Sequence, residues 1–183
     1  MSMILVHEIT VLQTRVVRLA LEVESRFEKA LEALARRDTE TARAIATSDD
    51  VIDRQEVEIE EECLKILALH QPVASDLRWV IAVLKINNDL ERIADIAVNI
   101  AERVPRLVPA PPSGMEQHLQ QMGDHAIGML RQTFDALARR SPDLAREVVA
   151  RDEALDQMHR QTFATVEQGV VAGPVEVAAL LLF

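Results

Sequence analysis

Glycine and proline are nearly absent from the first hundred residues of this chain. No glycine occurs before Gly114, and Pro72 is the one proline before Pro105. Both residue types interrupt helices, glycine through its backbone freedom and proline through its missing amide hydrogen. A long stretch without them that is rich in Ala, Leu, Glu and Arg predicts long helices, and no strand pattern competes.

Apolar residues at three- and four-residue spacing give the bounds of the expected helices. We expect helices over residues 3–37, 39–69, 74–104, 115–140 and 142–171, and a sixth that begins at residue 175. Asp38 is expected to cap the second helix, and Pro72 to end it. The expected core face of the third helix comprises Ile93, Ile96, Ala97, Ile100 and Val104.

The two halves of the chain resemble each other. Residues 32–53 (EALARRDTETARAIATSDDVID) align without gaps with residues 135–156 (DALARRSPDLAREVVARDEALD). The matches include a pair of arginines and two aspartates in register, which shared helical composition does not easily explain. We therefore predict an all-α fold of two tandem antiparallel three-helix bundles that arose by internal duplication.

The expected domains follow from this duplication. Residues 1–104 form the first bundle, residues 105–114 carry four of the seven prolines and form a linker, and residues 115–183 form the second bundle. The second bundle is expected to be truncated, with a last helix that continues past Phe183.

Composition excludes several classes of protein. Thirty acidic residues against twenty basic ones give a formal net charge of −10, whereas a nucleic-acid-binding protein carries a basic surface. No apolar run approaches the length of a membrane span. Cys63 is the one cysteine, which fits a reducing compartment, and it is interpreted as a core residue. We expect a cytoplasmic protein, and no motif of an enzyme active site is present.

An acidic stripe runs along the third expected helix. Glu91, Asp95, Asn99 and Glu102 lie at spacings of four, four and three, which places them on one face of a helix. Carboxylate and amide oxygens are the ligands that hard and borderline cations prefer. The alternative is an ordinary solvent-exposed acidic face.

A second set of acids lies on the second expected helix. Isoleucines recur every seven residues from Ile45 to Ile66, which marks a packing seam, and acids lie beside that seam. These acids are Asp49, Asp53, Glu56 and Glu60. Acids near a helix interface are costly unless they are paired or bind a cation. Salt bridges to Arg54 and Lys65 are the alternative.

The duplication adds a third set of acids. Asp152 and Asp156 occupy the positions that correspond to Asp49 and Asp53 in the first half. Their retention in both halves favours a site over chance.

Three segments resemble the PhoU family of bacterial phosphate-signalling proteins. They are Asp49–Asp53 with the acidic helix that follows, residues 71–78 (QPVASDLR), and residues 88–102 (NDLERIADIAVNIAE). The resemblance implies two three-helix bundles whose Glu/Asp-x-x-x-Asp motifs can hold a multinuclear iron cluster, with Zn, Mn and Mg as further candidates. It assigns metal ligation to Glu91 and Asp95, and more loosely to Asp49, Asp53, Asp152 and Asp156.

The resemblance also implies a function. It indicates a cytoplasmic, dimeric negative regulator of phosphate uptake and of the phosphate-starvation response. Such a regulator would act between the ATPase of the phosphate ABC transporter and a sensor histidine kinase. Two alternatives remain open, a metal-dependent hydrolase or oxidase on a helical bundle, and a metal-free helical adaptor.

Overall fold

The computed structural model describes residues 3–47, 50–106 and 115–172, and all of its regular elements are helical. The elements are α1 (Met3–Arg36), α2 (Thr39–Ala46), α3 (Asp50–His70), α4 (Ala74–Arg103), the short 3-10 helix η1 (Val104–Arg106), α5 (Met115–Arg139) and α6 (Pro142–Ala172). Within these ranges there is no strand, so the all-α prediction is confirmed. No described helix is long and apolar enough to cross a lipid bilayer.

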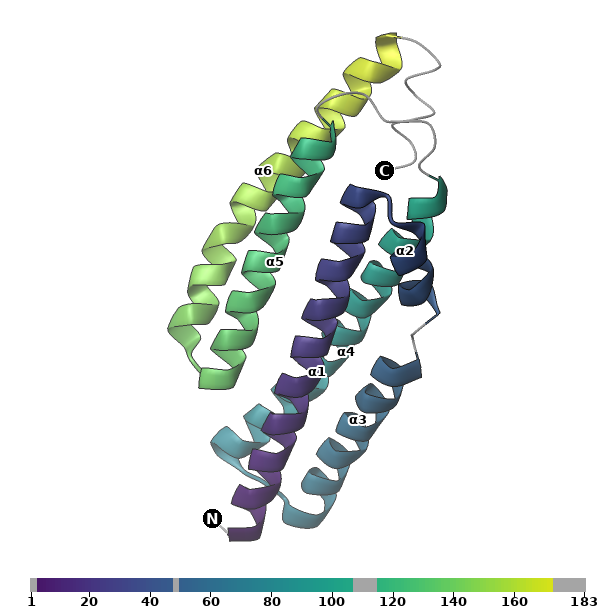
Figure 1. Cartoon of the computed structure of the whole chain (residues 1–183). Coiled ribbons are helices and arrows are strands. Elements are labelled where there is room, and N and C mark those ends of the chain that lie inside the picture. Colours follow the sequence, from purple (N-terminus) through teal and green to yellow (C-terminus); the bar gives the residue numbers. More distant parts are fainter. Residues whose placement is uncertain (1–2, 48–49, 107–114, 173–183) are drawn as a thin grey trace.

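The first bundle surrounds a core that α1, α3 and α4 share (Figure 1). Leu12 and Leu19 of α1, Ile52 and Ile59 of α3, and Leu90 of α4 are all at most 2% exposed. The two leucines of α1 are seven positions apart, as are the two isoleucines of α3, and this spacing brings side chains to one face of a helix. The isoleucine seam of the sequence therefore lies in the core, and Cys63 lies there too.

The expected helix over residues 39–69 is wrong in one respect, because two helices replace it. Helix α2 ends at Ala46, and Thr47 follows as its C-cap with a side-chain hydroxyl that donates to the carbonyl oxygens of Arg43 and Ala44. Ser, Thr and Asp side chains compete with helical backbone bonds. Thr47 therefore ends α2, and the next described helix, α3, begins at Asp50.

Helix α4 is rotated relative to the expected core face. Its buried positions are Val80, Val83, Asn87, Leu90, Ala94, Ala97 and Ala101, whereas Ile96 is 49% exposed. Ile96 was wrongly assigned to the core because it adjoins Ala97, which is buried. Close contact of α4 with α1 and α2 favours small side chains, so alanines hold the buried positions there.

The duplicated segments form the same corner in both halves. Arg37 and Arg140 have positive φ angles of 54° and 50°. Each ends a helix with backbone bonds of the same pattern, in which Asp38 N–H donates to Ala33 (2.9 Å) and Ser141 N–H to Ala136 (2.9 Å). This is the usual left-handed ending of a helix, formed here without glycine.

The hairpin of α5 and α6 packs on α1 through α5 (Figure 1). Phe134 enters the main core, and Arg131 bonds two carboxylates of α1, Glu24 at 2.6 Å and Glu28 at 3.0 Å. Arg140 lies 4.2 Å above the ring of Trp79 on α4. The interpretation of Trp79 as a core or interface residue is thus supported. Most of the predicted linker and the sixth helix lie outside the described residues.

Candidate metal centre

The acids of α3 lie along the edge of its packing seam. Because Ile52, Ile59 and Ile66 are fixed in the core, the intervening turns bring Glu56 to a half-buried position near α4. Asp53 lies one turn earlier on the exposed side of the same edge. The sequence therefore positions these carboxylates through the apolar residues between them.

Helix α4 brings two acids to the same place. Glu91 follows the buried Leu90 and is half-buried, while Asp95 is one turn later and exposed. The pKa of Glu91 is raised, first by burial and then by the neighbouring carboxylates of Asp95, Glu56 and Asp53. We call these four residues, Asp53, Glu56, Glu91 and Asp95, the carboxylate cluster.

Glu56 responds in the same way. Burial raises its pKa, and the charges of Glu60 and Asp53 raise it further. A carboxylate whose pKa is raised by like charges is more costly to ionise, and a bound cation would remove that cost. The cluster is therefore electrostatically suited to a cation.

A buried asparagine completes this region. Asn87 of α4 is 1% exposed, and its Nδ2 donates to the backbone oxygen of Glu56 (2.9 Å) and to Glu56 Oε1 (3.1 Å). Its Oδ1 is buried and has no hydrogen-bond partner among the described residues. A buried amide oxygen without a partner is unusual, and it lies beside the carboxylate cluster.

The donor set fits a metal ion in its chemistry, because carboxylate and amide oxygens suit Mg²⁺, Mn²⁺ and iron. Within the described residues, however, no three Asp, Glu, His or Cys side chains converge closely enough to hold a metal ion as they stand. Coordination would require the exposed ends of Asp53 and Asp95 to rotate toward Glu56 and Glu91.

The other sequence candidates lie elsewhere. Asp49 falls outside the described residues. Asp152 and Asp156 are on exposed faces of α6, which packs on α5, and Asp156 lies 3.8 Å from Arg160. The structure thus does not bring them to the carboxylate cluster.

One alternative was that Lys65 forms salt bridges with the acids beside the seam of α3. Its ammonium bonds Glu62 of α3 at 3.2 Å and lies 3.7 Å from Glu8 of α1. Neither of these acids belongs to the carboxylate cluster.

Two residues of the site were missed as ligand candidates. Glu56 was noted only as an acid beside the seam. Asn87 was not considered, although its spacing from Val80, Val83 and Leu90 places it on the same face of α4 as these apolar residues, which was a usable signal. Asn87 is therefore a polar residue within the core of the first bundle.

Comparisons with known proteins identify the family. A profile described as "PhoU domain" matches residues 16–104 and 119–180. A PhoU homologue of Aquifex aeolicus is 34% identical over 157 residues, which are 86% of this chain and 71% of that protein. A homologue of Thermotoga maritima is 30% identical over 178 residues, 97% of this chain and 77% of the relative. Both are described as homologues of the phosphate-specific transport system accessory protein PhoU, and not as enzymes.

Solved structures agree. The crystal structure of PhoU from Pseudomonas aeruginosa has a TM-score of 0.91 at 29% identity, covering 96% of this chain and 85% of that one. The phosphate transport system regulatory protein PhoU from Streptococcus pneumoniae has a TM-score of 0.85 at 28% identity, covering 97% and 84%. This chain, with its long helices, repeated corner and acidic helix pair, belongs to the PhoU family.

Proposed function

We propose that this chain is an accessory protein of a phosphate-specific transport system that represses phosphate uptake and phosphate-starvation signalling when phosphate is abundant. The observation that carries the proposal is the family match over both halves of the chain. The relatives are named as accessory and not catalytic proteins, so the hydrolase or oxidase hypothesis has no support from them.

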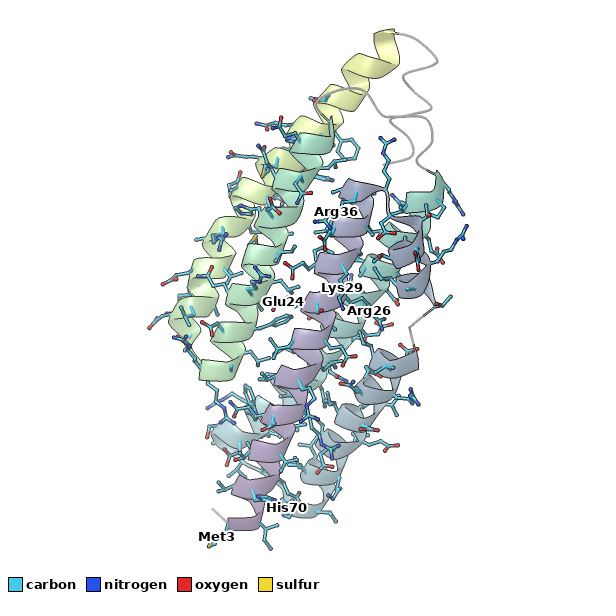
Figure 2. The ribbon with its side chains drawn as sticks, viewed as in Figure 1. Met3, Glu24, Arg26, Lys29, Arg36 and His70 are labelled. Carbon is cyan, nitrogen blue, oxygen red and sulfur yellow. The ribbon has the colours of Figure 1, made fainter. Side chains whose placement is uncertain are left out.

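The partners in this proposal are the ATPase of the phosphate transporter, a sensor histidine kinase and a second copy of the chain, all met in the cytoplasm. Large apolar side chains that are exposed together often mark a surface that contacts another protein. Met3, Leu69 and Val73 are each at least 67% exposed, and Figure 2 places Met3 and His70 together at one end of the first bundle. This end is the surface that we assign to partner contact.

The regulatory role is tested by deletion of the gene in the source bacterium. Alkaline phosphatase activity in abundant phosphate reports whether the starvation response is repressed. We expect the deletion strain to show constitutive activity, and the intact gene to restore repression. Normal repression in a deletion strain without a second copy of the gene would contradict the proposal.

We further propose that the carboxylate cluster holds a metal ion, mononuclear or as part of an iron cluster. Glu91 and Asp95 would provide ligands from α4, and Asp53 and Glu56 from α3. The metal would neutralise the like charges that raise the pKa of Glu91 and Glu56, and would tie the two helices together. Asp49 remains a candidate for a further ligand of this metal, whereas Asp152 and Asp156, on α6, are candidates for a separate, partial site.

A metal that binds only the folded chain must raise its melting temperature. We expect Mn²⁺, Fe²⁺ or Zn²⁺ to raise the Tm of the metal-stripped chain, and Glu91→Ala with Asp95→Ala to abolish that rise. The control is Glu58→Ala with Glu61→Ala, which removes two exposed acids of α3 outside the cluster. If metal leaves the Tm of the wild-type chain and of both variants unchanged, the metal-free adaptor is the better account.

A further inference from the structure

Helices α3 and α4 carry large apolar side chains on their exposed surfaces. Val57 and Leu64 of α3 are 48% and 53% exposed, and Leu77 and Ile81 of α4 are each 40% exposed. The pair on α3 is spaced by seven residues and the pair on α4 by four, so each pair lies on a single face of its helix. We call these four residues the apolar face of α3 and α4.

The packing of α3 against α4 brings the two pairs to the same level. The helices run antiparallel from the turn at residues 71–73, and Asn87 of α4 bonds Glu56 of α3 across their contact. In this register Leu64 lies seven residues before the turn and Ile81 eight residues after it. The two side chains are therefore neighbours on adjacent helices.

No described helix covers this face. Helix α1 packs on another side of α3, where Gln55 bonds Glu22 of α1 and Glu58 lies 4.0 Å from Arg15 of α1. The hairpin of α5 and α6 packs on α1, on the far side of that helix from α3 (Figure 1). Among the residues that the structure describes, the apolar face is thus open, and exposed apolar patches commonly mark protein contacts.

Opposite charges border the apolar face on its two helices. Glu61 of α3 and Lys85 of α4 are exposed, and neither forms an ion pair with a described residue. Around its helix axis, Glu61 is turned by about 140° from Glu56, and Lys85 by about 160° from Asn87. Because Glu56 and Asn87 mark the contact line of the two helices, Glu61 and Lys85 lie on the two outer edges of the face.

A second copy of the chain would match both borders. A two-fold axis parallel to the helices sets α3 of each copy against α4 of the other at the same level. Leu64 then faces Ile81 of the second copy, and Glu61 faces Lys85 of the second copy. A two-fold axis across the helices would instead set α3 against α3, with acids facing acids. The charges therefore favour the first arrangement.

We propose that two copies of this chain associate through the apolar face, with α3 of each copy against α4 of the other. The inference rests on the proposed function, which names a second copy as a partner, and it assigns the surface of that contact. The end of the first bundle with Met3, Leu69 and Val73 then serves the other proposed partners.

Sedimentation velocity of the purified full chain over a range of concentrations tests the surface. We expect a reversible dimer of the wild-type chain. Leu64→Glu places a carboxylate in the centre of the contact and should raise the dimer Kd by about tenfold or more. Leu69→Glu is the matched control, because it makes the same change at a 67% exposed position of α3 outside the face, and it should dimerise normally. Helix content by circular dichroism should be unchanged in both.

An exchange of charges tests the arrangement of the helices. Glu61→Lys and Lys85→Glu each set like charges against each other and should weaken the dimer. The double variant restores opposite charges at both contacts and should return the Kd to near the wild-type value. Within one chain the two side chains lie on opposite edges of the face, so only a contact between copies explains such a rescue.

Three results would overturn the inference. They are a wild-type chain that stays monomeric at all concentrations, a dimer that Leu69→Glu breaks and Leu64→Glu does not, and a double charge variant weaker than both single variants. The repression test remains separate from these results. Repression by the intact gene with a monomeric chain would overturn the surface alone, and a dimer broken by Leu64→Glu in a chain without effect on repression would overturn the regulatory role alone.

Discussion

Asn87 is the residue at which the fold and the candidate metal centre meet, and Asn87→Ala measures how much it contributes. The change removes a bond to a backbone oxygen, about 1 kcal/mol, and a bond to the Glu56 carboxylate, about 2 kcal/mol. It also removes a buried oxygen without a partner, which returns about 1 kcal/mol. We therefore expect a loss of about 2 kcal/mol in the free energy of unfolding.

The assay is urea unfolding of the metal-stripped chain, followed by circular dichroism. Asn88→Ala is the matched control, because Asn88 is the exposed neighbour on the same helix and gains the same helix propensity on change to alanine. A difference between the two variants below about 0.5 kcal/mol would refute the reasoning, since it is less than one ordinary buried hydrogen bond.

The same variant bears on function. Asn87 orients Glu56, and loss of a group that orients a metal ligand typically weakens binding by about 10- to 100-fold. We expect Asn87→Ala to weaken metal binding in that range, and Asn88→Ala to leave it unchanged. Equal metal affinities in the two variants would show that Asn87 does not orient a metal ligand.

Three further predictions follow from other contacts. Arg131→Met should lower the urea midpoint more than Arg139→Met does, because Arg131 joins α5 to α1 whereas Arg139 pairs within α5; equal midpoints would contradict this. The pKa of Glu56 is raised on folding, so its contribution to metal-free stability is complete below the unfolded pKa and is lost as pH rises through the folded pKa. Glu56→Gln should accordingly raise the Tm at neutral pH. A lower Tm there would show that the ionised Glu56 carboxylate stabilises the fold, which contradicts the prediction. Burial raises the pKa of the Cys63 thiol to about 12, so it should react with a thiol reagent at pH 8 only in denaturant, and rapid reaction of the native chain would refute its burial.

Much of the fold was predictable because its signals are local. The spacing of apolar residues and the positions of Pro72 and Pro142 set the helix bounds to within a few residues. The repeated arginine pair also marked a real structural repeat, since Arg37 and Arg140 form the same corner. Such features depend on a few neighbouring residues, which a single sequence displays.

The errors arose where packing chooses between similar local patterns. Threonine is tolerated inside many helices, and only the structure shows that Thr47 caps the end of α2. The exposed Ile96 and the buried Ala97 are adjacent, and close helix packing favoured the smaller side chain. Hydrophobicity alone ranks the isoleucine first and so predicts the wrong face.

The candidate site was predictable in its composition but not in its geometry. The four-residue spacing of Glu91 and Asp95 identified one half of it. The other half required the register of α3 against α4, which places Glu56 beside Asn87. A register between helices depends on contacts across the core that periodicity does not determine.

The metal content of the purified chain tests the central claim most directly. The wild-type chain and the variant with Glu91→Ala and Asp95→Ala would be prepared in parallel and analysed by inductively coupled plasma mass spectrometry. We predict metal in the wild-type chain, none in the variant, and the same helix content in both by circular dichroism. Equal metal content in the two proteins, or none in either after addition of iron, manganese and zinc, would contradict the assignment of the carboxylate cluster as a metal centre.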